Sequence, residues 1–194
     1  MSEENPLVLV VEDERDLAEL YTTWLAESYR VRTVNDGRAA LDALEDEVRV
    51  VLLDRRMPDL SGDEVLDALR ERGLDCRVAM VTAVEPDTGV LEMGFDDYLV
   101  KPVSREELTR TVSNLLVRDE YDEGVRRLFS LASKKALLES ERNRKELEGS
   151  EKYQQLLDDI ERLRDELDDK LARLSETDDL TRVYQDIARD DGEE

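Results

Sequence analysis

The chain has 194 residues, of which 40% are hydrophobic and 41% are charged, and its formal net charge is −23. This length leaves room for one domain of ordinary size with an appendage, or for two small domains. A charge this negative repels nucleic acid and anionic membranes at long range, which argues against indiscriminate DNA binding.

Residues 1–118 alternate short apolar runs with amphipathic stretches. The first of these runs, residues 7–11, is apolar at every position, as expected of a strand that is buried on both faces. Ser104 and Glu107 form a capping box, which predicts the start of a helix. In chain order the pattern predicts a strand over 7–11, a helix over 14–27, a strand over 29–34, a helix over 37–44, a strand over 48–53, a helix over 61–72, a strand over 77–81, a short helix between 87 and 93, a strand over 98–100 and a helix from 104 to about 117.

Five strand–helix pairs in succession imply a parallel sheet with helices on both faces. Right-handed crossovers make such a sheet doubly wound, and its ligands bind at the carboxyl ends of the strands. The sequence therefore predicts an α/β domain over 1–118.

Residues 119–194 show no strand pattern, and Gly and Pro are nearly absent from them. Apolar positions between 125 and 138 predict one amphipathic helix, and Gly149-Ser150 breaks it. From Tyr153 to Leu174 apolar residues recur every three or four positions, which favours a short coiled coil or a helical hairpin. A third short helix is expected near Thr177, before an acidic tail at 190–194 that is expected to be disordered.

Polar residues stand at the carboxyl ends of the predicted strands. Glu12 and Asp13 follow the first strand, Asp54 the third, Thr82 the fourth and Lys101 the fifth. Clustered carboxylates repel one another unless a cation lies among them, and oxygen ligands without His or Cys favour Mg²⁺. A carboxylate beside Mg²⁺ can attack a phosphoryl group whose charge a hydroxyl and an ammonium stabilise. The pattern indicates a Mg²⁺-dependent phosphoacceptor.

Four runs of sequence resemble the receiver domain of two-component response regulators, in that family's order and near its spacing. They are Val10-Val11-Glu12-Asp13-Glu14, Leu52-Leu53-Asp54-Arg55-Arg56-Met57-Pro58-Asp59-Leu60-Ser61-Gly62, Val81-Thr82-Ala83 and Asp96-Asp97-Tyr98-Leu99-Val100-Lys101-Pro102. The resemblance covers about residues 6–118 and implies a flavodoxin-like, five-stranded fold.

The resemblance also implies residue roles. Asp54 would be the phosphoacceptor, and Glu12, Asp13 and the main-chain carbonyl of Arg56 would complete the Mg²⁺ site. Glu12 stands where many members have Asp, which keeps the charge and lengthens the reach. Arg56 is a bulky cation two residues after the acceptor, and we expect it to affect the lifetime of the phosphoryl group.

Three further positions receive roles from the resemblance. Thr82 and Tyr98 would form the switch pair, and Lys101 would contact the phosphoryl group. A cis peptide bond is expected between Lys101 and Pro102.

The run from Arg118-Asp119-Glu120-Tyr121-Asp122 to Leu138-Glu139 resembles the HalX domain, which follows receivers in halophilic archaea. The composition agrees, since only six of the 28 basic residues are lysine, and an acidic, lysine-poor surface is typical of halophilic proteins. A merely acidic mesophilic protein is the alternative. We expect a receiver over 1–118 and a HalX-like output or docking region over 119–194.

The composition also bears on the cellular compartment and on the chemistry that is available. Cys76 is the one cysteine, so no internal disulfide is possible and a reducing compartment is expected. No apolar run approaches the ~20 residues of a membrane span, and the N-terminus does not resemble a signal peptide, so a cytoplasmic protein is expected. Histidine is absent, which excludes phosphohistidine chemistry and His-dependent nucleophiles within this sequence.

The sequence therefore predicts a response regulator that receives its phosphoryl group from a separate histidine kinase. It would not be an enzyme beyond assisting its own phosphorylation and dephosphorylation. The C-terminal helices are expected to mediate homodimerisation or docking of a protein partner.

Two other functions stay open. A DNA-binding regulator could act through the locally basic segment 126–145, although no helix-turn-helix or zinc-finger pattern is present. A Mg²⁺-dependent aspartyl phosphatase usually has a second carboxylate two residues after its nucleophile, where this chain has Arg56.

Overall fold

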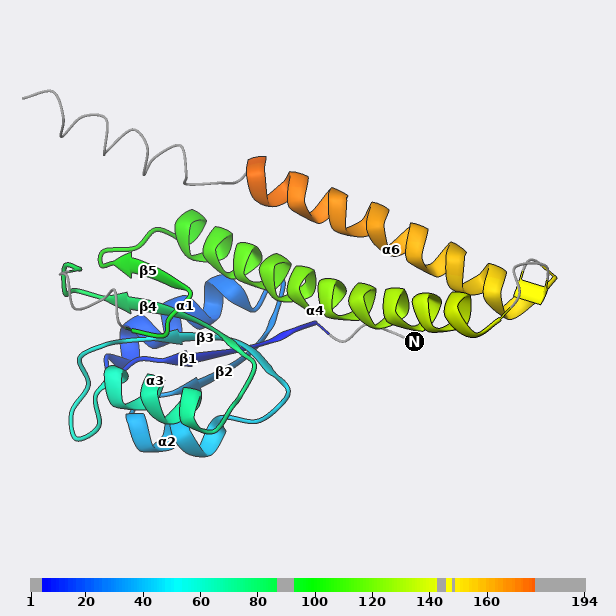
Figure 1. Ribbon diagram of the computed structural model, residues 1–194. Coiled ribbons are helices and arrows are strands. Elements are labelled where there is room, and N and C mark those ends of the chain that lie inside the picture. Colours follow the sequence, from blue (N-terminus) through cyan, green and yellow to red (C-terminus); the bar gives the residue numbers. More distant parts are fainter. Residues whose placement is uncertain (1–4, 87–92, 143–145, 148, 177–194) are drawn as a thin grey trace, which may run out of the picture. The chain divides into compact units, whose positions relative to one another are not determined.

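The computed structural model describes residues 5–86, 93–142, 146–147 and 149–176 (Figure 1). Five strands form one parallel sheet in the order β2-β1-β3-β4-β5. The strands are β1 (Leu7–Val11), β2 (Arg30–Val34), β3 (Val48–Leu53), β4 (Arg77–Thr82) and β5 (Asp97–Val100). The predicted five-stranded parallel sheet is confirmed.

Helices cover both faces of the sheet, as a doubly wound fold requires. They are α1 (Arg15–Leu25), α2 (Gly37–Ala43), α3 (Gly62–Glu71) and α4 (Arg105–Glu141). The apolar run of β1 serves both faces, because Leu7 and Leu9 pack with α2 and α3 while Val8 and Val10 pack with α1 and the first half of α4. This alternation explains why the strand is apolar at every position.

Capping side chains set two of the helix starts. The Ser61 side chain accepts from the Glu64 amide while the Glu64 carboxylate accepts from the Ser61 amide, a reciprocal box that begins α3. Ser104 and Glu107 form the same pair before α4, at amide–side-chain distances of 2.9 and 3.2 Å. The predicted capping box at Ser104 is therefore confirmed.

Most predicted boundaries lie within two residues of the observed ones, but the end of α4 does not. The sequence predicted separate helices over 104–117 and 125–138, whereas α4 is continuous for 37 residues. Gly124 does not interrupt it. A Cβ at this position would lie 2.7 Å from Leu167 Cδ2, so the missing side chain leaves room for Leu167. The predicted helices over 87–93 and near Thr177, and the acidic tail, fall largely or wholly outside the described residues.

The chain forms two compact units, 1–119 and 120–194. In the second unit the C-terminal half of α4 pairs with α6 (Glu151–Glu176) as an antiparallel hairpin. The register follows from three contacts, Glu120 with Lys170, Gly124 with Leu167 and Glu139 with Tyr153. A buried seam lines α6: Tyr153, Ile160, Leu163 and Leu167. Of the two arrangements that the sequence left open, the structure has the hairpin.

Among the described helices, none has a stretch of sufficient length and apolar character to span a bilayer.

Candidate functional site

Three carboxylates meet at the carboxyl end of the sheet. β1 and β3 are parallel neighbours with Val11 paired to Leu53, so the residues that follow them emerge side by side. Oxygens of Glu12, Asp13 and Asp54 lie within 4.8 Å of one another. Glu12 is 1% exposed and Asp54 6%. The structure thus brings together the three acidic residues that the sequence singled out.

Lys101 reaches the same cluster from the end of β5. Its Nζ lies 2.6 Å from Asp54 Oδ2 and 2.7 Å from Glu12 Oε2. Burial opposes the charge on Lys101, but the hydrogen bonds and charges of Asp54 and Glu12 outweigh it and raise the pKa of Lys101. Burial raises the pKa of Glu12 as well. The hydrogen bond and charge of Lys101 offset only part of this rise. The Lys101–Pro102 peptide bond is cis, as predicted.

The donor set suits a hard divalent cation. All three side chains are carboxylates, and none of the three offers sulfur or imidazole. With all groups ionised, Lys101 offsets one of three negative charges, so two remain. Glu12, Asp13 and Asp54 therefore fit Mg²⁺ in charge and in ligand type.

Thr82 and Tyr98 both contact Val84, in the loop that follows β4. The Val84 amide donates to Thr82 Oγ1 at 3.4 Å, and the Tyr98 hydroxyl donates to the Val84 carbonyl at 2.7 Å. Thr82 is fully buried at the strand end. Val84 was not predicted from the sequence, because it contributes its amide and carbonyl, and any residue type offers these groups.

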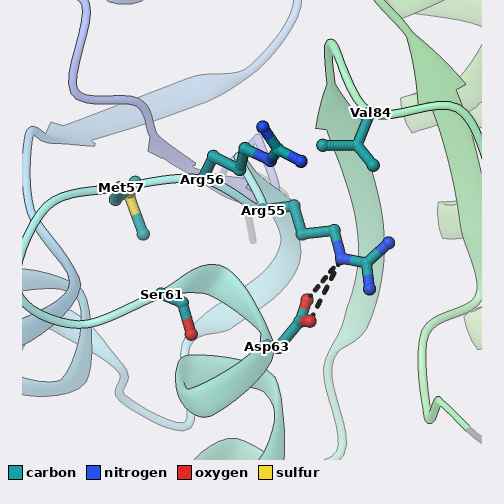
Figure 2. A pocket seen from close by; sticks show the side chains of 6 residues that line it. All are labelled: Arg55, Arg56, Met57, Ser61, Asp63 and Val84. Carbon is teal, nitrogen blue, oxygen red and sulfur yellow. Dashed lines mark hydrogen bonds and ion pairs between the residues drawn. The ribbon is translucent and has the colours of Figure 1, made fainter.

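A pocket of about 410 Å³ opens beside the loop that follows β3 (Figure 2). Its lining is Arg55, Arg56, Met57, Ser61, Asp63 and Val84. Arg55 Nε lies 3.0 and 3.1 Å from the two Asp63 carboxylate oxygens, and this pairing, followed by contact with Tyr98, raises the pKa of Arg55. No role for Arg55 was predicted from the sequence, although Asp63, eight residues later, is a possible partner of opposite charge.

Arg56 contributes through two different groups. Its amide donates to Asp54 Oδ1 at 3.0 Å, which fixes the orientation of the Asp54 carboxylate. Its side chain lines the pocket, as Figure 2 shows. The backbone at this position is thus tied directly to Asp54.

Comparison with protein families identifies two domains in succession. A response regulator receiver domain matches residues 8–113, and a HalX domain matches residues 117–184. The first match covers more than half of the chain, including every candidate site residue.

Individual relatives match part of the chain. A protein of Haloferax volcanii, provisionally named a transcriptional regulator, is 57% identical over 135 residues, which are 69% of this chain and 23% of that protein. The response regulator SaeR of Staphylococcus aureus is 34% identical over 57% of this chain and 50% of its own length. The chain therefore spans half or less of the length of these curated relatives.

A solved structure shares the fold of the first unit. The response regulator TrrA of Thermotoga maritima, in complex with Mg²⁺-BeF, is 32% identical, with a TM-score of 0.50 over 57% of this chain and 98% of TrrA. Topology, family match and relatives agree on one assignment. The chain belongs to the response regulator receiver family and carries a HalX domain behind its receiver.

Proposed function

We propose that this response regulator accepts a phosphoryl group on Asp54 from a histidine kinase in a Mg²⁺-dependent reaction. The observation that supports this most directly is the approach of Lys101 Nζ to within 2.6 Å of Asp54 Oδ2, beside two further carboxylates. The donor histidine must lie outside this sequence, which has none.

The residues divide the chemistry between them. An Asp54 oxygen attacks phosphorus, the bond from phosphorus to the kinase imidazole breaks, and an acyl phosphate results. Lys101 transfers its ammonium hydrogen bond from the Asp54 carboxylate to a phosphoryl oxygen, and the Thr82 hydroxyl donates to another. Glu12, Asp13, Asp54 and the Arg56 main-chain carbonyl would hold Mg²⁺. The ion supplies positive charge against the negative charge that gathers on the phosphoryl oxygens.

Val84 is proposed to transmit the change at Asp54 to the rest of the receiver. When the Thr82 hydroxyl turns to the phosphoryl group, the Val84 amide loses its acceptor, Thr82 Oγ1 at 3.4 Å. The loop that contains Val84, whose carbonyl accepts from the Tyr98 hydroxyl, is then free to move. We infer that residues 1–118 act as the phosphoacceptor module and that this movement changes how residues 119–194 self-associate or dock a partner.

The test is phosphorylation with Mg²⁺ and a small phosphodonor. One acid-stable, base-labile phosphoryl group is expected per chain, and none after Asp54→Asn. Asp13→Ala should reduce labelling by weakening the metal site. Asp59→Asn is the matched control, because Asp59 is an exposed aspartate of the same loop at φ 66°, a backbone conformation that Asn adopts well. Undiminished labelling of Asp54→Asn would refute the proposal.

A second candidate, DNA binding, is favoured by the provisional name of the Haloferax relative and by the basic residues of α4. Sequence-dependent binding of the full chain to duplex DNA in molar salt would support it. An aspartyl phosphatase is disfavoured, because the position two residues after Asp54 is an arginine whose side chain lines the pocket.

A further inference from the structure

Arg55, the residue after the proposed phosphoacceptor, is held at two points by the start of α3. Its carbonyl accepts from the Gly62 amide at 2.9 Å, and its Nε lies 3.0 and 3.1 Å from the two carboxylate oxygens of Asp63 (Figure 2). The Arg55 side chain is 19% exposed, so solvent and salt screen this ion pair only in part. The start of α3 therefore fixes the position of the guanidinium.

The same guanidinium contacts Tyr98 of β5. Hydrogen bonding with Tyr98 contributes to the raised pKa of Arg55, after the stronger effect of Asp63. The Tyr98 hydroxyl donates to the Val84 carbonyl at 2.7 Å, and a phenol oxygen that donates one hydrogen bond still accepts another. The Tyr98 ring also packs against Phe95, with the ring centroids 5.4 Å apart. Three neighbours, Arg55, Val84 and Phe95, thus hold Tyr98 where it lies.

This arrangement leaves one donor of Arg55 unused. Arg55 Nη1 is buried and has no hydrogen-bond partner in the part of the chain that the structure describes. A buried donor without an acceptor costs free energy, so the contacts with Asp63 and Tyr98 must outweigh that cost for the arrangement to persist. The position of Tyr98 is therefore sensitive to the loss of either contact.

We propose that Arg55, anchored by Asp63, is a positioning residue that holds Tyr98 in its resting position and thereby opposes the switch that phosphorylation of Asp54 drives. The inference rests on the proposed phosphoacceptor function and deepens it, because it names the residue that sets how readily the receiver switches. The Tyr98 ring must leave Arg55 before it can turn. Removal of the guanidinium therefore favours the switched state, and a ligand that prefers this state gains apparent affinity.

The test is titration of the full chain with beryllofluoride, a phosphoryl analogue, in the presence of Mg²⁺, followed by fluorine NMR. Arg55→Met removes the charge and keeps most of the length of the side chain. It should lower the apparent Kd by about two- to tenfold, the range that the net contribution of a single hydrogen bond gives. Tyr98→Phe lacks the hydroxyl that Arg55 contacts, so in that background Arg55→Met should not lower the Kd.

Asp63→Asn gives a second variant, because it removes the anchor and keeps the charge of Arg55. It should lower the Kd in the same direction. Asp67→Asn is its matched control, since Asp67 is an exposed aspartate one turn further along α3 and loses the same charge. The Kd of Asp67→Asn should equal that of the parent. Circular dichroism of each variant shows whether the fold remains formed.

A second measurement needs no phosphoryl analogue. In the unphosphorylated chain, nuclear Overhauser effects between the rings of Phe95 and Tyr98 should weaken in Arg55→Met and persist in Asp67→Asn. Unchanged effects in Arg55→Met would overturn the proposal, and so would a lower Kd for Arg55→Met that persists with Tyr98→Phe. A parent chain that fails to bind beryllofluoride, or an Asp54→Asn chain that binds it equally well, would instead contradict the phosphoacceptor function, and the ring measurement would still decide the role of Arg55.

Discussion

At the scale of single residues, Gly62 determines how closely the loop after β3 packs on the start of α3. Its amide donates to the Arg55 carbonyl at 2.9 Å. A Cβ at this position would lie 2.1 Å from the Asp54 carbonyl oxygen and 2.9 Å from Arg55 Cα. These are main-chain atoms, so no side-chain rotation can relieve the clash, and the absence of a side chain sets the place of Asp54.

We therefore expect Gly62→Ala to destabilise the fold by about 1–3 kcal/mol, as overpacking does, and to lower phosphorylation because Asp54 is displaced. Urea unfolding and the labelling assay measure the two effects. Gly94→Ala is the control, since a Cβ there meets only side-chain atoms of Arg70, the nearest at 3.3 Å, and no main-chain atom. Equal unfolding midpoints for Gly62→Ala and the parent would contradict this account.

The site residues divide into those that the sequence could predict and those that it could not. The clustering of Glu12, Asp54 and Lys101 was predictable, because the ends of parallel strands converge whatever path the loops take. Val84 was not, because it contacts Thr82 and Tyr98 through its main chain, and that depends on the path of a loop.

At the scale of secondary-structure elements, Asp119 fastens α4 to the receiver sheet. Its carboxylate is buried and pairs with Arg49 of β3, with Arg49 Nε at 2.8 Å from Oδ2. Arg77 of β4 lies 3.8 Å from the other oxygen and also pairs at 3.0 Å with Asp96, which precedes β5. One carboxylate of α4 therefore pairs with arginines of two neighbouring strands, β3 and β4.

Asp119→Asn should cost about 1–3 kcal/mol, less than a fully buried pair because Arg49 remains 38% exposed. Glu27→Gln is the matched control: it breaks the Arg105–Glu27 pair, whose side chains are 53% and 64% exposed, and should cost about 0.5 kcal/mol or less. Thermal melts of both variants at one salt concentration provide the comparison. Similar losses in both would show that burial of Asp119 contributes nothing.

Helices and strands were predictable where the spacing of apolar residues is a local signal. They were less predictable where packing between helices determines the structure. The strands and α1 to α3 follow from apolar spacing and caps. The continuity of α4 did not, because a glycine such as Gly124 can end a helix or lie inside one, and the local sequence does not decide between the two. The choice between coiled coil and hairpin likewise depended on contacts between helices.

At the scale of the whole molecule, net charge controls stability. A charge of −23 repels itself in the compact state, and at ~1 M salt the screening length of about 3 Å removes most of that repulsion. We expect the melting temperature to rise steeply with KCl from roughly 0.1 to 2 M, a range set by that screening length. Melting curves that are flat across this range would contradict the halophilic interpretation.

The acidic cluster also has a consequence for the balance between stability and activity. Lys101 pairs with Glu12 and Asp54, but in the part of the chain that the structure describes no side chain pairs with Asp13. Asp13 therefore repels two neighbours without an offsetting contact. Two unit charges 4 Å apart in water repel by about 1 kcal/mol.

The receiver should therefore be more stable without this carboxylate than with it. In the presence of a chelator, Asp13→Asn is expected to raise the melting temperature. When Mg²⁺ is added, only the parent chain, and not Asp13→Asn, should gain stability. A lower melting temperature for Asp13→Asn in chelator would show that Asp13 supports the fold. A higher melting temperature for Asp13→Asn would mean that Asp13 destabilises the receiver when no cation is bound. Only a bound cation would remove that destabilisation.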